Sequence, residues 1–367
     1  MKKFFQPKSP NTNLSIRTLP KAELHVHLEG TMSPALVKQM STKYGITLPP
    51  NLFTNDGTAF QWNTFLEFLN KYDDASKVVC CKEAMEDITY DYLRESHSHG
   101  SIYTELTVSP DHLNRPGVNV PYIETISAVE RGIKRANADF GIEARIIVVL
   151  VRHLGQEKCE ALVQTVIQNP HEYVCGIGLA GDEASYPPAL FVKAFELAKQ
   201  AGLKLTAHAG ECTNPDDVKN AIELLQVDRI GHGIHAAFSP EVLAIAKNKN
   251  IHFELCPVSN LKLKTHERYP EEFSELKHPL SIFHEQGISY SLGSDDPPFF
   301  ETNIFNEYYY AHRNFGLKRH DLLAVTHAAI EHSFAPNELK IKLNKKIMDY
   351  AELHGFLLEN DNQPKFK

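Results

Sequence analysis

Residues 203–232, LKLTAHAGECTNPDDVKNAIELLQVDRIGH, indicate how the chain folds. The stretch begins with a short apolar run at 203–208, continues as an amphipathic segment at 214–225, and ends in a second short run at 229–232. The amphipathic segment opens with Asn and Pro, which is typical of a helix start because Asn caps free amides and Pro suits the first turn. We therefore expect a strand, a helix and a second strand.

The same alternation extends in both directions from this stretch. Runs rich in β-branched residues recur eight times, separated mostly by helix-like segments such as 187–200 and 239–247. The expected strands are 22–27, 102–108, 144–151, 174–179, 203–208, 229–232, 252–256 and 289–292. Several are apolar throughout, as parallel strands covered on both faces are. The predicted fold class is α/β, a (β/α)8 TIM barrel, with an open doubly wound sheet as the alternative.

The chain shows no Pro/Gly-rich linker, so we expect one domain over 1–367 with peripheral tails at 1–14 and 356–367. The longest insertion, at 33–100 between the first two strands, has a helical pattern. The longest apolar run, 146–151, is far shorter than the roughly 20 residues of a bilayer span. The N-terminus has no apolar signal region. These features predict a cytoplasmic protein with no membrane partner.

Composition narrows the class of ligand. Lys and Arg number 38 and Asp and Glu number 46, a net charge of −8 that provides no positive field for nucleic acid. The six cysteines have no CxxC spacing, which excludes a zinc ribbon, and glycine-rich phosphate loops are absent. We expect a small-molecule ligand and no nucleic acid, and the oligomeric state stays open.

Residues that can bind a metal stand near the ends of several expected strands. His25 and His27 are two apart on a strand, so their side chains project to the same side. His208 and Asp295 end two other strands, and parallel strands end on one face of a barrel. Three imidazoles and one carboxylate suit Zn²⁺, with Fe²⁺ and Mn²⁺ left open. The charge of about +1 on such a zinc site lowers the pKa of bound water towards about 7.

Three further polar residues stand beside these positions. Glu211 follows His208 by three residues, where it can exchange a proton with a substrate. Alternatively, it is only an acidic residue at the N-terminus of a helix, where the helix dipole favours negative charge. His232 lies between glycines, where it can orient a nucleophile or pack in the core. Asp296 is next to Asp295 and points another way, so it can reach a nucleophile or a ring nitrogen, although such a pair before Pro is also a common turn.

Six motifs in chain order resemble those of the adenosine/adenine deaminase family of metal-dependent amidohydrolases, and bacterial adenosine deaminases in particular. They are LPKAELHVHLEGT (19–31), GIGLAGDE (176–183), AHAGE (207–211), RIGHG (229–233), CPVSN (256–260) and SLGSDDP (291–297). The resemblance implies a (β/α)8 barrel with one zinc ion. The ligands that it implies are His25, His27, His208 and Asp295.

The resemblance also implies roles in deamination at C6 of a 6-aminopurine. Glu211 would donate a proton to purine N1, and His232 and Asp296 would be partners of the attacking hydroxide. The remaining contacts that it implies are Asp296 with N7 and the Gly181 backbone with N3. The substrate-binding set predicted in this way is His27, Glu29, Leu69, Tyr72, Gly181 and Asp296.

Substrate choice depends on smaller differences between family branches. Relatives that use nucleosides typically have an Asp that meets the ribose where this chain has Glu29. GLAGDE and RIGHG resemble the nucleoside branch, whereas CPVSN resembles the adenine branch. The segment FLEFLNKYDD (65–74) resembles the family's lid helix, with an amphipathic core helix as the alternative. We expect adenosine and 2′-deoxyadenosine first, adenine or an N6-substituted purine second, and a non-purine amidohydrolase or a binding protein as more distant alternatives.

Overall fold

The computed structural model describes residues 5–7 and 16–358. Eight parallel strands form one sheet in which neighbours follow each other along the chain. They are β2 (Lys21–His27), β3 (Ser101–Val108), β6 (Glu143–Val151), β7 (Val174–Ala180), β8 (Lys204–Ala209), β9 (Arg229–His232), β10 (His252–Leu255) and β11 (Tyr290–Leu292). Each overlaps one predicted strand, so the alternation of apolar runs and helical segments predicted the sheet correctly.

Contacts between the first and last strands bring the sheet round into a nearly closed barrel. Val26 in β2 forms a parallel bridge with Asp295, just beyond β11. The amide of His27 donates to the Asp295 carbonyl at 3.0 Å, and the amide of Asp295 donates to the His25 carbonyl at 3.2 Å. These bonds satisfy backbone groups that an open sheet would leave at its edges. The predicted (β/α)8 barrel is confirmed, and the open doubly wound alternative is wrong.

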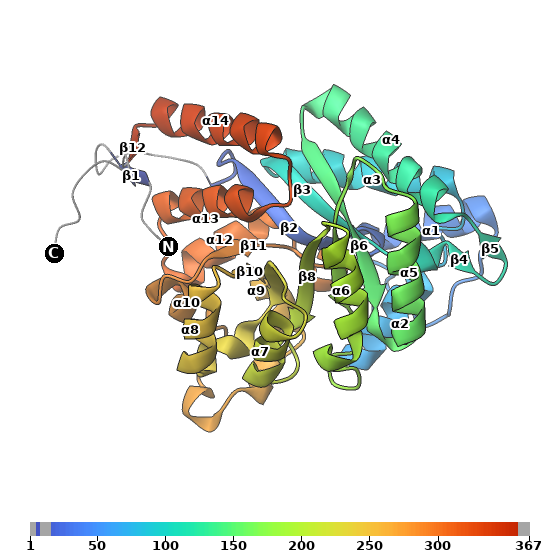
Figure 1. The fold of residues 1–367 in the computed structure, drawn as a ribbon. Helices are drawn as coiled ribbons and strands as arrows, with labels where there is room; N and C mark the ends of the chain where they lie inside the picture. Colours follow the sequence, from blue (N-terminus) through green and yellow to red (C-terminus); the bar gives the residue numbers. More distant parts are fainter. Residues whose placement is uncertain (1–4, 8–15, 359–367) are drawn as a thin grey trace.

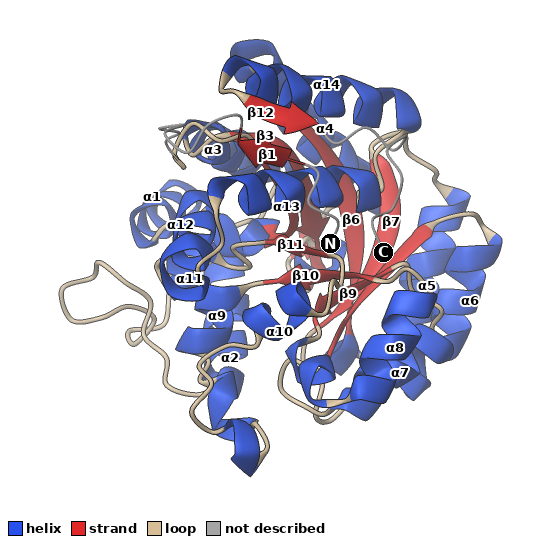
Figure 2. Cartoon of the chain, turned by 90° about the vertical axis from the view of Figure 1, so that its left-hand side faces the viewer, coloured by secondary structure: helices blue, strands red, loops and turns tan. Residues whose placement is uncertain are grey.

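Helices follow most strands and surround the barrel (Figures 1 and 2). They include α4 (Tyr122–Phe140), α5 (Gln156–Gln168), α6 (Val192–Gln200), α7 (Pro215–Glu223), α8 (Pro240–Asn248), α9 (Pro257–Lys262) and α10 (Leu280–Glu285). After β11 come α11 (Pro297–Phe300), α12 (Ile304–Phe315), α13 (Arg319–His332) and α14 (Asn337–Leu353). The predicted cap forms, because the side chain of Asn214 accepts from two first-turn amides of α7, and Ser239 accepts from the amide of Val242 at the start of α8.

The insertion between β2 and β3 is helical, as predicted. It places one of its helices at the face of the barrel where the parallel strands end. It contains α1 (Pro34–Tyr44), α2 (Phe65–Ser76) and α3 (Lys82–Ser98). In α2, the ring of Phe68 lies 5.6 Å from that of Phe299 and 5.0 Å from that of Phe300, both in α11. These aromatic contacts hold α2 beside the segment that follows β11, next to Asp295 and Asp296.

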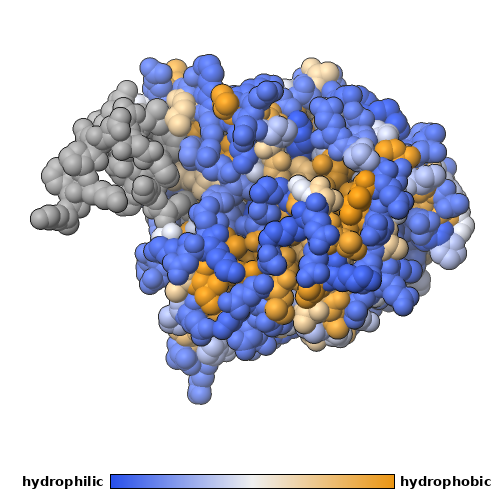
Figure 3. Space-filling view, viewed as in Figure 1, coloured by the Kyte–Doolittle hydropathy of each residue, from blue (hydrophilic) through white to orange (hydrophobic). Residues whose placement is uncertain are grey.

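Burial follows the sequence pattern. Ile146, Ile147 and Val148 of β6 are fully inaccessible to solvent, as expected of a strand between the barrel interior and the helices. Hydrophilic side chains cover most of the face seen in Figure 3, with hydrophobic ones showing between them. Within the described part of the chain, no helix has the length and apolar character needed to cross a membrane.

The predicted tails are described only in part. Phe5–Pro7 (β1) pairs antiparallel with Phe356–Leu358 (β12). Figure 1 shows this small sheet near the N-terminal sequence and beside α14. The rest of both predicted tails, 1–4, 8–14 and 359–367, lies outside the described residues.

Candidate active site and metal centre

Four side chains of the predicted metal site meet where β2, β8 and β11 end. Nε2 of His27 lies 3.2 Å from Nε2 of His208 and 3.4 Å from Oδ1 of Asp295. Nε2 of His25 lies 3.5 Å from the same oxygen, and one ligand atom from each of the four residues lies within 4.8 Å of the others. Donors placed about 2.0–2.2 Å from one tetrahedral ion lie roughly 3.3–3.6 Å apart. The observed spacing therefore fits one shared ion. We refer to His25, His27, His208 and Asp295 together as the metal-type group.

Contacts on the far side of two rings determine which nitrogen faces this group. Nδ1 of His208 donates to the carbonyl of Leu179 at 2.9 Å, and Nδ1 of His25 donates to Oε2 of Glu254 at 2.7 Å. Each bond leaves the lone pair of Nε2 available. The buried Nε2 of His25 has no hydrogen-bond partner among the described residues. Histidines that bind a metal commonly pair their second nitrogen in this way, so the donor set fits a divalent transition-metal ion.

A buried charge network, which sequence reasoning missed, holds Glu254 under His25. Oε1 of Glu254 accepts from Nε of Arg229 at 2.6 Å and from Oγ1 of Thr206 at 3.0 Å, and Arg229 also donates to Glu105 at 2.6 Å. Burial opposes the charge of Glu254, but Arg229 and His25 outweigh it and lower the pKa of Glu254 to about 2. The available signal was weak: charged residues interrupt otherwise apolar strands at 105, 229 and 254.

Backbone strain occurs at two positions of the site. His232 and Asp295 have positive φ angles of 56° and 62°, a conformation that costs a non-glycine residue on the order of 1–3 kcal/mol. Surrounding contacts hold both residues there. Oδ2 of Asp295 accepts from Oγ of Ser259 at 2.6 Å, and Nδ1 of His232 lies 3.3 Å from Nδ2 of Asn260. The turn at Asp295 directs its carboxylate towards the other three members of the metal-type group. The turn at His232 directs the imidazole towards the same group.

Glu211 lies in the loop after β8 with its carboxyl group beside this centre. Its Oε1 lies 3.7 Å from Nε2 of His232 and 3.3 Å from Nδ2 of Asn260. Glu183 holds the loop, because it accepts from the amides of Glu211 and Cys212 at 3.1 Å. Burial, followed by the charges of Asp295 and Glu183, raises the pKa of Glu211 well above its usual range. The carboxyl group is therefore suited to donate a proton.

Two of these supporting residues stood in motifs without an assigned role. Glu183 ends GIGLAGDE and Asn260 ends CPVSN. Their importance comes from contacts across the barrel, since Glu183 bonds to a loop 28 residues later and Asn260 bonds to a residue 49 positions earlier. Sequence spacing alone does not indicate such partners.

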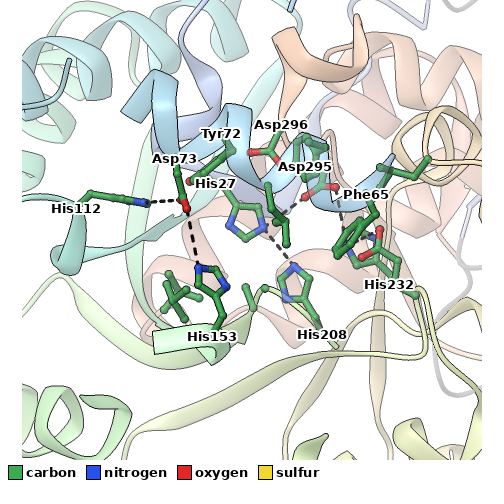
Figure 4. Close-up of a pocket in the computed structure, with 18 residues that line it drawn as sticks. His27, Phe65, Tyr72, Asp73, His112, His153, His208, His232, Asp295 and Asp296 are labelled. Atoms are coloured by element: carbon green, nitrogen blue, oxygen red, sulfur yellow. Dashed lines mark hydrogen bonds and ion pairs between the residues drawn. The ribbon is translucent and has the colours of Figure 1, made fainter. Parts of the chain in front are cut away.

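The side chains gathered here line one pocket (Figure 4). Its apolar lining comes from α2, from the ends of β6 and β7, and from the residue after α9, and consists of Phe65, Phe68, Leu69, Val149, Val151, Ala180 and Leu263. The space, which includes solvent at its open mouth, is about 640 Å³. Four of its polar groups, Glu211, His232, Asp295 and Asp296, lie on the side of the metal ligand candidates, and Asp73, His112 and His153 line another side. The arrangement suits a small ring whose polar edge faces the metal-type centre.

Five of the six predicted substrate residues line this pocket: His27, Leu69, Tyr72, Gly181 and Asp296. Glu29 does not, and its side chain is only 1% exposed. Its Oε1 accepts from the amide of Ser109 at 2.9 Å, and its Oε2 accepts from the hydroxyl of Tyr72 at 3.3 Å. The carboxylate of Glu29 therefore faces protein groups behind Tyr72 instead of the pocket.

A tight contact between Gly30 and Asp296 makes a test of the predicted role of Asp296 possible. A Cβ atom on Gly30 would lie 1.7 Å from Oδ1 of Asp296 and 2.9 Å from Cε2 of Tyr72. Gly30→Ala should therefore move the Asp296 carboxylate. We expect kcat/KM to fall about 100-fold, since misplacement by about 1 Å can cost that much. Kinetics and thermal unfolding check this: full activity in a folded variant would mean that the position of Asp296 is unimportant.

Comparison with known proteins agrees with this geometry. Residues 20–350 match the family model described as adenosine deaminase. The adenine deaminase of Chelativorans sp. (strain BNC1) is 37% identical over 334 residues, which are 91% of this chain and 99% of that protein.

Two of the solved structures that resemble this chain show that it shares their fold. A Burkholderia ambifaria amidohydrolase with bound Zn has a TM-score of 0.81 and 24% identity, covering 95% of this chain and 98% of its own. The Arabidopsis thaliana N6-methyl-AMP deaminase has a TM-score of 0.79 and 23% identity, covering 92% and 99%.

Proposed function

This chain belongs to the adenosine deaminase family, and on that premise we propose that it is an adenine deaminase, which converts adenine and water into hypoxanthine and ammonia. Members of the adenosine/adenine deaminase family are hydrolases acting on amidine C–N bonds, and this chain is one of them. The name of the Chelativorans relative supports the free base as substrate. Adenosine, which the sequence motifs placed first, becomes the second candidate.

The observation that carries the choice of a free base is the position of Glu29. A nucleoside deaminase needs a polar group for the ribose, and sequence comparison pointed to this residue. Its carboxylate is instead occupied by the Ser109 amide and the Tyr72 hydroxyl, outside the pocket lining. Redirecting it to a ribose would break both buried hydrogen bonds, and leaving a buried group unpaired costs about 1–3 kcal/mol.

We infer that the metal-type group binds one divalent ion, zinc in the first place and Fe²⁺ or Mn²⁺ as alternatives. The ligands would be His25, His27, His208 and Asp295. The bound Zn in the Burkholderia structure supports this choice, as do the imidazole and carboxylate donors. When bound, such an ion lowers the pKa of water and supplies a nucleophile at neutral pH.

The protein groups around this centre would divide the remaining work. Glu211 would donate its proton to N1 as C6 becomes tetrahedral, and His232 would hold the proton taken from the nucleophile. Burial raises the pKa of the Asp296 carboxyl well above its usual range, so a protonated Asp296 would donate a hydrogen bond to N7, and the backbone at Gly181 would contact N3. As the C6–N6 bond breaks, the proton held by His232 would pass to the leaving amine, which departs as ammonia. The new hydroxyl group on C6 would return a proton to Glu211 and leave a 6-oxopurine.

A side-by-side assay tests the proposed substrate. We expect the zinc-loaded protein to turn over adenine with a kcat/KM at least about 100-fold above that for adenosine or 2′-deoxyadenosine, since a site matched to one hydrogen-bonding group rejects an analogue strongly. Ultraviolet absorbance and chromatography of hypoxanthine measure the reaction. Faster turnover of adenosine would reverse the order of the two candidates. Failure with these purines and with N6-methyladenine would indicate a non-purine amidohydrolase.

A further inference from the structure

Asp73, near the end of α2, lines the pocket between two histidines from other elements. Its Oδ1 lies 3.4 Å from Nε2 of His112, which follows β3, and its Oδ2 lies 4.0 Å from Nε2 of His153, which follows β6. Figure 4 shows these three residues together on one side of the pocket, away from His232 and Asp295. None of the catalytic roles proposed above involves this second polar cluster, which consists of Asp73, His112 and His153.

Close approach at Gly181 shows which part of a bound purine the cluster would face. A Cβ atom on Gly181 would lie 3.0 Å from Nδ1 of His153, so the ring of His153 stands directly beside this backbone. Gly181 is the proposed contact for N3. His153, and Asp73 with it, would therefore lie along the edge of the purine that carries N3 and N9.

Gly30 provides the second point of reference. Its Cβ position would touch both Oδ1 of Asp296 and Cε2 of Tyr72, so these two side chains are neighbours. Asp296 is the proposed partner of N7, and Asp73 is the residue after Tyr72 on α2. In a purine, C8 and N9 follow N7 around the five-membered ring, and N9 is attached to C4 next to N3. A ring held by Gly181 and Asp296 therefore directs N9 towards Asp73.

We propose that Asp73 is a specificity-determining residue whose carboxylate accepts a hydrogen bond from N9–H of free adenine. The inference rests on the proposed function, because only a free base has this hydrogen. A nucleoside carries ribose on N9 and would leave the carboxylate without its donor. Sites that hydrogen-bond an N–H of the substrate discriminate strongly against analogues without it.

Neighbouring groups position this carboxylate. His112 lies between Asp73 and Glu29, with its Nδ1 3.7 Å from Oε1 of Glu29. Burial opposes the charge of His112, but hydrogen bonds to Asp73 and Glu29 outweigh it and raise the pKa of His112 to about 9. A cationic His112 pairs with the carboxylate of Asp73 and holds it in place. Glu29, the expected ribose contact, thus supports the residue that would meet N9–H.

The test compares adenine with 9-methyladenine, which lacks N9–H but adds little bulk. We expect the wild-type protein to prefer adenine in kcat/KM by about 100-fold or more. In Asp73→Ala, kcat/KM for adenine should fall about 10–100-fold, as expected for a lost hydrogen bond to a charged group. The value for 9-methyladenine should change less than about threefold. Asp73→Asn, whose amide oxygen can still accept, should retain an intermediate preference.

Asp74→Ala is the matched control on the same helix. Oδ1 of Asp74 lies 2.7 Å from Nζ of Lys77, and Asp74 is not among the pocket-lining residues. Its variant should keep the wild-type preference. An equal loss for both substrates in Asp73→Ala would overturn the inference, because a carboxylate that only fastens α2 gives that result. If the variant has no measurable turnover, calorimetric affinities for hypoxanthine and 9-methylhypoxanthine decide in the same way.

The wild-type rates separate this inference from the proposed function. A wild-type protein that turns over adenosine but not adenine would remove the proposed function and this inference with it. A wild-type protein that prefers adenine, combined with an Asp73→Ala variant that keeps the same preference over 9-methyladenine, would remove only the role of Asp73.

Discussion

Replacing Glu211 with glutamine is expected to reduce kcat by about 10²–10⁴-fold, the range that a positioned general acid contributes. Glutamine is close in size to glutamate and keeps an oxygen that can accept from Asn260. It has no carboxyl proton to pass to N1. Glu211 is buried with its carboxyl group 3.7 Å from Nε2 of His232, so the change is made at a fixed position beside the proposed catalytic groups.

Metal content and binding must be measured on the same preparation of Glu211→Gln. We expect zinc by elemental analysis to match the wild-type protein, because Glu211 is outside the proposed ligand set. Hypoxanthine should still bind. Glu223→Gln, on the exposed end of α7, is the matched control and should keep full activity. Substantial turnover by Glu211→Gln would show that the proton comes from another group.

Replacing His208 with alanine is expected to remove the metal, and activity with it. Nε2 of His208 lies 3.2 Å from Nε2 of His27 at the centre of the donor group. Loss of a supporting contact alone typically lowers metal affinity about 10–100-fold, so loss of a ligand should cost more. Zinc after dialysis should fall from about one ion per chain to near zero, and kcat should fall with it.

Two measurements make the His208 result specific. His97→Ala, at an exposed position on α3, should retain both zinc and activity. Brief chelation of the wild-type protein should remove activity, and added zinc should restore it, whereas added zinc should restore little in His208→Ala. Unchanged zinc content in a folded His208→Ala protein would contradict the proposed ligand set.

Much of the proposed metal site could be predicted because its residues stand at strand ends. The period of a strand places His25 and His27 on one side, and parallel strands end on one face, so His208 and Asp295 had to come near them. Neither inference requires knowing how the helices pack. Strand periodicity and barrel topology together explain why the sequence predicts that these four side chains, separated by up to 270 positions, lie close together.

The surrounding contacts were beyond sequence reasoning. Arg229, Glu105 and Glu254 come from three strands, and only the barrel places Arg229 2.6 Å from an oxygen of each glutamate. Asp73, His112 and His153 come from a helix and from two segments that follow strands, with no shared period. Such partners depend on how α2 packs over the barrel, which no local pattern encodes.

At Glu29, too, the sequence predicted the type and position of the residue but not the direction of its side chain. Its type and position next to HVHL were evident from the sequence and favoured contact with a ligand. The fold turned its carboxylate to Ser109 and Tyr72 and left Asp73 in the pocket. By itself, the sequence determined the barrel and the hydrolytic chemistry, because strand period and side-chain type are local properties. Only the tertiary structure decided which carboxylate faces the pocket, because the direction of a side chain depends on packing between elements far apart in the chain.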